Sequence, residues 1–139
     1  MFERILVPVD LTEKNRRAVE VAGGLAEVAD GSVTLLHVIE PLDLPFEELE
    51  DFYERLEEKA ADAMYGLAAP LRESGRGADR HVIYGDRATE IVRYSQENGF
   101  DLLVMSSRRF GPDEQETRNW ATLSHKVAIM AQTPVLLVK

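Results

Sequence analysis

The sequence predicts an α/β fold in which five parallel strands alternate with helices. Five short apolar runs rich in β-branched residues recur along the chain, and each is nearly continuous, as expected of strands covered on both faces. The segments between them are long enough for a helix, which predicts right-handed crossovers and a doubly wound sheet with helices on both faces. At 139 residues with no repeat or linker, the chain forms one domain over residues 1–139. The predicted strands are Ile5–Val9, Val33–Ile39, His81–Tyr84, Leu102–Met105 and Val135–Val138.

The first two helical segments are marked by apolar stripes and by residues typical of helix ends. Thr12 is a candidate N-cap for the first helix, whose stripe runs to the stop at residues 30–31. The second segment begins after Pro45, and Pro70 should kink or end it near its last turn. The stripe of this second segment consists of Phe46, Leu49, Phe52, Tyr53, Leu56, Ala60, Ala63, Met64, Leu67 and Leu71.

Two shorter helices complete the alternation. The third runs from about residue 88 to 96 and is capped by the Asn-Gly pair at residues 98–99. It is expected to bury Ile91, Val92 and either Tyr94 or Ser95. The fourth covers roughly residues 121–131, with Leu123, Val127 and Met130 facing inward. Each of these helices connects two predicted strands, so the order along the chain is strictly alternating.

Charge and composition exclude several classes of function. The net charge of −9 disfavours binding to nucleic acid or to anionic lipid, because both carry charge of the same sign. No apolar run approaches the roughly 20 residues needed to span a bilayer, and the N-terminus lacks the pattern of a signal peptide. The chain has no cysteine, which excludes disulfides and thiolate chemistry. These features predict a cytoplasmic protein without membrane insertion.

Five motifs in order resemble the universal stress protein family along the whole chain. They are residues 5–10 (Ile-Leu-Val-Pro-Val-Asp), 35–38 (Leu-Leu-His-Val), 85–91 (Gly-Asp-Arg-Ala-Thr-Glu-Ile), 101–106 (Asp-Leu-Leu-Val-Met-Ser) and 133–138 (Thr-Pro-Val-Leu-Leu-Val). The resemblance implies a sheet of strand order 3-2-1-4-5. It also implies a homodimer joined partly through the C-terminal strand.

The loop after the fourth strand departs from the family's ATP-binding pattern. Many members carry Gly, two residues, Gly, nine residues, then Gly and Ser or Thr. On this chain the first glycine falls on Ser106 and the second on Arg109. The final pair falls on residues 119–120 (Asn-Trp), or on residues 121–122 (Ala-Thr) if the match is anchored on the last strand. No glycine survives, and because β-carbons stand where backbone must approach phosphate, ATP affinity should fall.

The charged residues of this loop allow two interpretations. Arg108 and Arg109 could contact phosphate through their guanidinium groups, or they could pair with Asp113, Glu114 and Glu116 of the same loop. With Gly111-Pro112 and few apolar anchors, residues 108–120 are expected to be the most mobile internal segment in the absence of ligand.

The half of the family site that holds the nucleoside is better preserved. Asp10 matches the acid that contacts nucleoside in ATP-binding members, although an aspartate before Leu11-Thr12 also suits a helix cap or a turn. Pro8, Val9 and the backbone of Val38 match the adenine-side walls. The degenerate nucleotide site implied by the resemblance comprises Pro8, Val9, Asp10, Val38, Ser106, Arg109, Thr122 and Leu123.

Neither catalysis nor metal binding is supported by the residue pattern. His37 lies inside a strand, which favours a hydrogen-bonded structural histidine, and His81 and His125 lack metal-ligand spacing. Ser106 and Ser107 follow a strand without the Gly-x-Ser-x-Gly elbow that exposes a nucleophile. We therefore predict no catalytic residue and no metal ligand.

Together with the resemblance, these observations predict a non-enzymatic universal stress protein. It would be a dimeric stress-tolerance or accessory regulatory protein that acts through contacts with another protein, with ATP binding weakened or lost. The alternative is a nucleotide sensor that binds ATP or AMP with magnesium through Asp10, Val38, Arg109 and Thr122.

Overall fold

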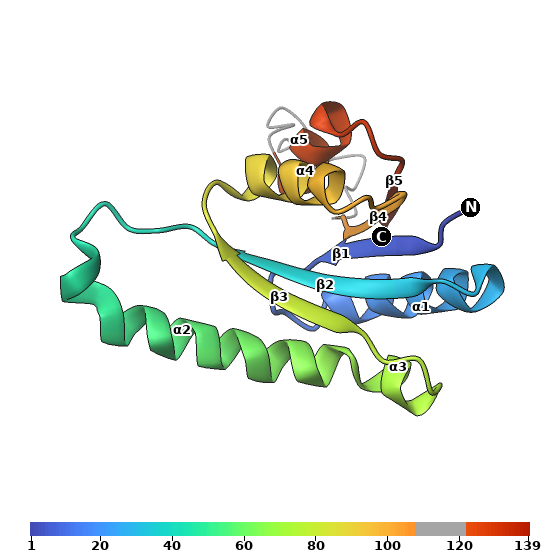
Figure 1. Cartoon of the computed structure of the whole chain (residues 1–139), viewed down its shortest axis with the longest axis horizontal. Helices are drawn as coiled ribbons and strands as arrows, with labels where there is room; N and C mark the ends of the chain where they lie inside the picture. Colours follow the sequence, from blue (N-terminus) through green and yellow to red (C-terminus); the bar gives the residue numbers. More distant parts are fainter. Residues whose placement is uncertain (108–121) are drawn as a thin grey trace, which may run out of the picture.

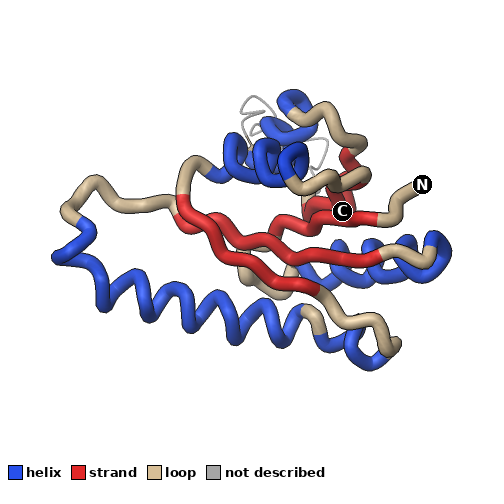
Figure 2. Tube along the Cα trace, in the orientation of Figure 1, coloured by secondary structure: helices blue, strands red, loops and turns tan. Residues whose placement is uncertain are grey.

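The computed structural model describes residues 1–107 and 122–139, in which five parallel strands form one sheet of order β3-β2-β1-β4-β5 (Figures 1 and 2). The strands are β1 (Arg4–Pro8), β2 (Ser32–Ile39), β3 (Asp79–Tyr84), β4 (Leu102–Ser106) and β5 (Val135–Val138). The helices are α1 (Asn15–Ala29), α2 (Phe46–Leu67), α3 (Ala69–Glu73), α4 (Arg87–Glu97) and α5 (Leu123–Met130). The predicted fold class and strand order are confirmed. The predictions for Arg108, Arg109 and the loop 108–120 lie outside the described residues.

Helices cover both faces of the sheet (Figure 1). On one face, α1, α2 and α3 bury a core that includes Val7, Leu35 and Met64. On the other face, α4 and α5 bury a second core that includes Leu6, Ile91 and Val127. Central strands with apolar side chains on both faces explain why the predicted runs are continuous rather than alternating.

The start of α1 differs from the sequence prediction. The helix begins at Asn15, and its N-cap is Lys14, which makes no side-chain capping bond. Thr12 is not the cap, because its hydroxyl and its N–H both donate to one carboxylate oxygen of Asp10, at 2.6 and 3.0 Å. The strand end therefore closes into an Asx-type turn before the helix starts.

Helix α1 ends at residues 30–31, as predicted, but the glycine does not supply the left-handed residue that usually ends a helix. Asp30 takes the left-handed conformation, with φ of 53°. Gly31 follows at a close backbone approach, where an added Cβ would lie 2.6 Å from the carbonyl oxygen of Glu3. Glycine is needed here for space rather than for φ.

The second helical segment is interrupted near Pro70, as predicted: α2 ends at Leu67, and the short helix α3 follows with Pro70 in its first turn. Two expectations about buried residues need correction. Phe46 and Phe52 belong to the predicted apolar stripe but are exposed, since the first half of α2 extends beyond the sheet (Figure 1). Met130, predicted to face inward, is also exposed at the end of α5.

The sheet topology brings the carboxyl ends of β1, β2 and β4 together. β1 pairs with β2 on one side and with β4 on the other, so the chain reverses its direction of winding between β1 and β4. β3 and β5 form the two edges of the sheet. Among the described helices, none is long and apolar enough to cross a membrane.

Candidate functional site

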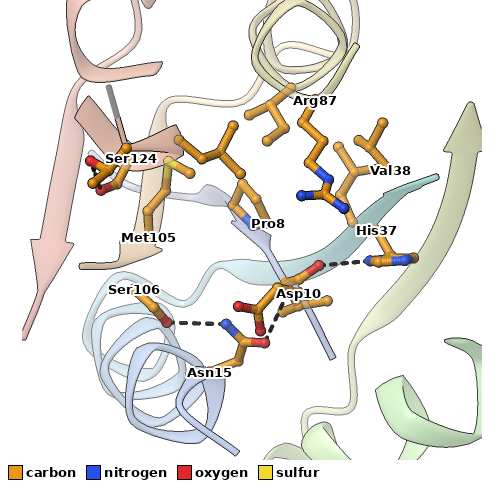
Figure 3. Close-up of a pocket in the computed structure, with 14 residues that line it drawn as sticks. Pro8, Asp10, Asn15, His37, Val38, Arg87, Met105, Ser106 and Ser124 are labelled. Atoms are coloured by element: carbon orange, nitrogen blue, oxygen red, sulfur yellow. Dashed lines mark hydrogen bonds between the residues drawn. The ribbon is translucent and has the colours of Figure 1, made fainter. Parts of the chain in front are cut away.

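A cavity of about 180 Å³ opens at the carboxyl ends of β1, β2 and β4 (Figure 3). This is the switch point of the sheet, where open α/β folds bind their ligands. Seven of the eight residues predicted for the site line this cavity, and the eighth, Arg109, lies outside the described residues. The lining residues are Pro8, Val9, Asp10, Asn15, Leu36, His37, Val38, Arg87, Ile91, Met105, Ser106, Thr122, Leu123 and Ser124.

The walls of this cavity are mainly apolar and belong to the central strands. Pro8 and Val38 come from the ends of β1 and β2, and Met105 comes from β4 (Figure 3). Ile91 of α4 adds to the wall from the helix that covers this face. Apolar walls with a few polar groups are typical of sites that bind small organic molecules.

Asn15 fixes the floor of the cavity, and the sequence analysis did not identify it. Its side chain is almost fully buried, with 2% of the residue's surface exposed. The amide oxygen accepts the N–H of Asp10 at 3.0 Å, and the amide nitrogen donates to the hydroxyl of Ser106 at 3.2 Å. One side chain thereby connects the end of β1 to the end of β4 (Figure 3).

The side chain of Ser106, which the resemblance aligns with the first glycine of the ATP-binding pattern, is held by the start of α1. Besides accepting from Asn15, its hydroxyl donates to the backbone carbonyl of Lys14 at 3.4 Å. Thr122 and Ser124 lie across the cavity at the start of α5. The Thr122 hydroxyl accepts the N–H of His125 at 3.3 Å, so Thr122 is the N-cap of α5.

His37 has the structural role that the sequence predicts. Its Nδ1 lies 2.8 Å from the carbonyl oxygen of Val9. A carbonyl can only accept, so Nδ1 carries the proton and donates. The bond ties β2 to the residue that precedes Asp10, and it sets the course of the chain where β1 ends.

Asp10 makes the hydrogen bonds expected of a turn residue, which is one of its two predicted roles. Its carboxylate accepts from Thr12, and the next residue, Leu11, has a positive φ of 71°. A β-carbon in the left-handed region costs free energy, and such strained positions cluster beside binding sites. These contacts account for Asp10 without a ligand, so a contact between Asp10 and a nucleoside stays a prediction.

Arg87 is the other residue that the sequence analysis missed. It is the first residue of α4, and its side chain points over the cavity opposite Asp10 and beside Val38 (Figure 3). Its Nε lies 3.9 Å from a carboxylate oxygen of Glu40, which makes a loose and partly exposed ion pair. The sequence signal that could have identified Arg87 is its position in the motif at residues 85–91, directly after a predicted strand.

Asp86, the N-cap residue before Arg87, fixes the start of α4. Its carboxylate accepts the N–H of Thr89 at 3.0 Å and the Thr89 hydroxyl at 2.8 Å. These hydrogen bonds hold the pKa of Asp86 below its usual value. A charged cap keeps the first turn of α4, and with it Arg87, in a defined place.

A second groove adjoins the cavity on the side of α2. It shares Asp10, His37, Val38 and Arg87 with the cavity and continues to Leu42, Leu56 and Lys59. No group of three or more His, Asp or Glu side chains with metal-binding geometry occurs within residues 1–107 and 122–139.

Comparison with known proteins now identifies the family. The sequence model of the universal stress protein family matches residues 1–139. The chain belongs to the universal stress protein family. A universal stress protein of Thermus aquaticus is 32% identical over 145 residues, with both chains covered completely.

Solved structures of universal stress proteins share the fold. One, in complex with cAMP, has a TM-score of 0.73 and 19% identity, and the match covers 99% of this chain and 97% of that one. Another, from Archaeoglobus fulgidus in complex with dAMP, has a TM-score of 0.73 and 17% identity, with both chains covered completely.

Proposed function

We propose that this universal stress protein is a non-enzymatic regulatory protein that acts through protein contacts in the cytoplasm and binds ATP weakly. Proteins of this family are generally not classical enzymes. The observation that carries the proposal is the lining of the cavity. Pro8, Val9, Asp10 and Val38 form part of its wall, and the side chain of Ser106 stands where the family's ATP-binding pattern has its first glycine.

The phosphate end is the weak part of the site. The glycine pattern of ATP-binding members would place bare backbone at residue 106, where phosphate oxygens need close approach to N–H groups. Here the Ser106 side chain lies between β4 and α1 and bonds to Asn15 and Lys14. Phosphates that approach this point meet a side chain already engaged with the protein.

The protein-contact role includes a homodimer through β5. Within residues 1–107 and 122–139, this strand pairs with β4 and no strand pairs with its other edge, where a second chain could add a strand. Leu136 on β5 is 38% exposed, and Ile129 on the neighbouring α5 is largely exposed. A twofold pairing of β5 with its copy would satisfy the backbone groups and bury these side chains.

Calorimetric titration with ATP and magnesium tests the weak-binding proposal. We expect a dissociation constant above roughly 100 μM, because the phosphate groups lack their backbone contacts. A low-micromolar constant would contradict the proposal. In that case Arg108→Ala and Arg109→Ala would show whether guanidinium groups have replaced the glycines.

The alternative function is sensing of adenine nucleotides. A specific observation favours nucleotides that carry a single phosphate. Arg87 offers a planar guanidinium over the cavity, away from the strand end that Ser106 closes. The similar structures that hold cAMP and dAMP carry a single phosphate. Asp10, Val38 and Thr122 would form the rest of the contact surface.

Titrating adenosine, AMP and ATP in parallel separates the two functions. A sensor should bind AMP at least tenfold more tightly than adenosine, and Arg87→Ala should abolish that difference. Arg93→Ala, an exposed arginine on the same helix paired with Glu90, is the matched control. If AMP and adenosine bind equally weakly to the wild type, the sensor is excluded.

A further inference from the structure

The first half of α2 and the loop before it carry apolar side chains that the fold does not bury. Leu42, Leu44 and Phe46 are 51, 57 and 61% exposed, and Phe52 is also exposed. Figure 1 shows the reason: the first turns of α2 extend past the ends of β2 and β3, where no strand covers them. We call residues 40–58 the α2 arm.

The α2 arm is held in place despite its exposure. Phe46 stacks on Tyr53 with ring centroids 5.7 Å apart, and Tyr53 meets Tyr84 edge-on at 5.5 Å. The Tyr53 hydroxyl accepts the N–H of Leu42 at 2.9 Å, which fixes the loop against the helix. Tyr84 also donates to Glu57. A surface preformed in this way loses little conformational entropy when a partner binds.

The charge on the α2 arm identifies the kind of partner. Residues 40–58 contain nine acidic residues and one arginine, so their net charge of −8 nearly equals the −9 of the whole chain. A second copy would bring another −8 to the same place, and anionic lipid or nucleic acid would also be repelled. Apolar side chains surrounded by acids complement a segment that is apolar and basic.

We propose that the α2 arm is a docking surface for an amphipathic, basic segment of another protein. Leu42, Leu44 and Phe46 would contact its apolar face, and acids such as Glu50 and Glu54 would face its lysines or arginines. The groove that runs from Leu42 and Leu56 to Arg87, with a volume of about 590 Å³, offers a concave place for an apolar side chain. The proposal rests on the protein-contact role proposed above, and it names the surface and the chemistry of the partner.

Fluorescence anisotropy with a labelled synthetic peptide tests this docking surface. The probe is a helical peptide with leucines at positions i, i+3, i+4 and i+7 and lysines elsewhere. One control peptide replaces its lysines with glutamate, and another replaces its leucines with serine. We expect the probe to bind the full chain, both controls to bind at least tenfold more weakly, and amide shifts in nuclear magnetic resonance spectra to map to residues 42–56.

Paired variants separate the apolar contribution from the charged one. Leu42→Ser/Phe46→Ser and Glu50→Lys/Glu54→Lys should each weaken binding at least tenfold. Val28→Ser, an exposed apolar residue on α1, and Glu20→Lys/Glu97→Lys are the matched controls and should leave binding unchanged. All positions are on the surface, so unaltered thermal melting should confirm that each variant folds.

Several outcomes would overturn the docking proposal. They are wild-type affinity in the arm variants, equally tight binding of the serine peptide, and amide shifts confined to residues outside both the α2 arm and the adjoining groove. If light scattering shows that Leu42→Ser/Phe46→Ser lowers self-association of the free protein, the arm is an interface between copies instead. The variants of the α2 arm change no residue that lines the nucleotide cavity, so failure of the peptide experiment leaves the weak-ATP proposal separately decidable.

Discussion

Replacing Asn15 with alanine should destabilise the protein through the loss of one buried side chain at the floor of the cavity. The amide of Asn15 bonds to the Asp10 N–H and to the Ser106 hydroxyl. Two hydrogen bonds contribute about 1 kcal/mol each, and leaving a partly buried N–H unpaired adds a further penalty of about 1 kcal/mol. Alanine recovers at most about 0.7 kcal/mol through its higher helix propensity. The free energy of unfolding should therefore fall by about 2 kcal/mol.

Urea unfolding measures this loss directly. The midpoint should fall while the slope of the free energy against denaturant stays unchanged, because the same surface is exposed on unfolding. In a thermal scan the loss corresponds to a decrease of roughly 6–8 °C in the melting temperature. Asn98→Ala is the matched control, since its exposed amide makes one bond, to the carbonyl of Tyr94.

A second variant checks the proposed cause. Asn15→Asp keeps an oxygen that accepts the Asp10 N–H, but it removes the donor to Ser106 and buries a charge near the carboxylate of Asp10. It should destabilise at least as much as alanine, and more at neutral pH than at acidic pH. A loss below about 0.5 kcal/mol for Asn15→Ala would refute the assignment of Asn15 as the connection between β1 and β4.

Two further predictions concern β3 and β5. Burial and the hydrogen bond to Glu57 raise the pKa of Tyr84 to about 12. Because the unfolded phenol ionises near pH 10, the stabilisation is complete below pH 10 and is lost as pH rises to about 12. Tyr84→Phe should flatten this decline in stability, measured by urea unfolding from pH 9 to 12, and an unchanged slope would contradict the assignment. Leu136→Lys on β5 should shift a dimer of about twice 15.6 kDa towards monomer in light scattering, whereas Glu97→Lys should not. A wild type that is monomeric at tens of micromolar would exclude the dimer.

The sequence predicts the fold because its signals are local and redundant. Short continuous runs rich in β-branched residues are typical of strands covered on both faces, and helical stripes between them indicate parallel crossovers. The resemblance also places Pro8, Val9, Asp10 and Val38 in one site, and the structure brings them to one cavity. They meet because the carboxyl ends of neighbouring parallel strands share one edge of the sheet.

The tertiary structure decides what the local pattern cannot. The spacing of apolar residues predicts that Phe46 is buried, but it carries no information on where the sheet ends. Because the sheet ends before this turn of α2, Phe46 is exposed. Thr12 has the residue type of an N-cap, yet the nearby carboxylate of Asp10 takes both of its donors. Asn15 and Ser106 are 91 residues apart and become partners only when β1 and β4 pair. Which side chains meet across a sheet depends on strand order and on where the strands end, and both are settled by packing of the whole chain.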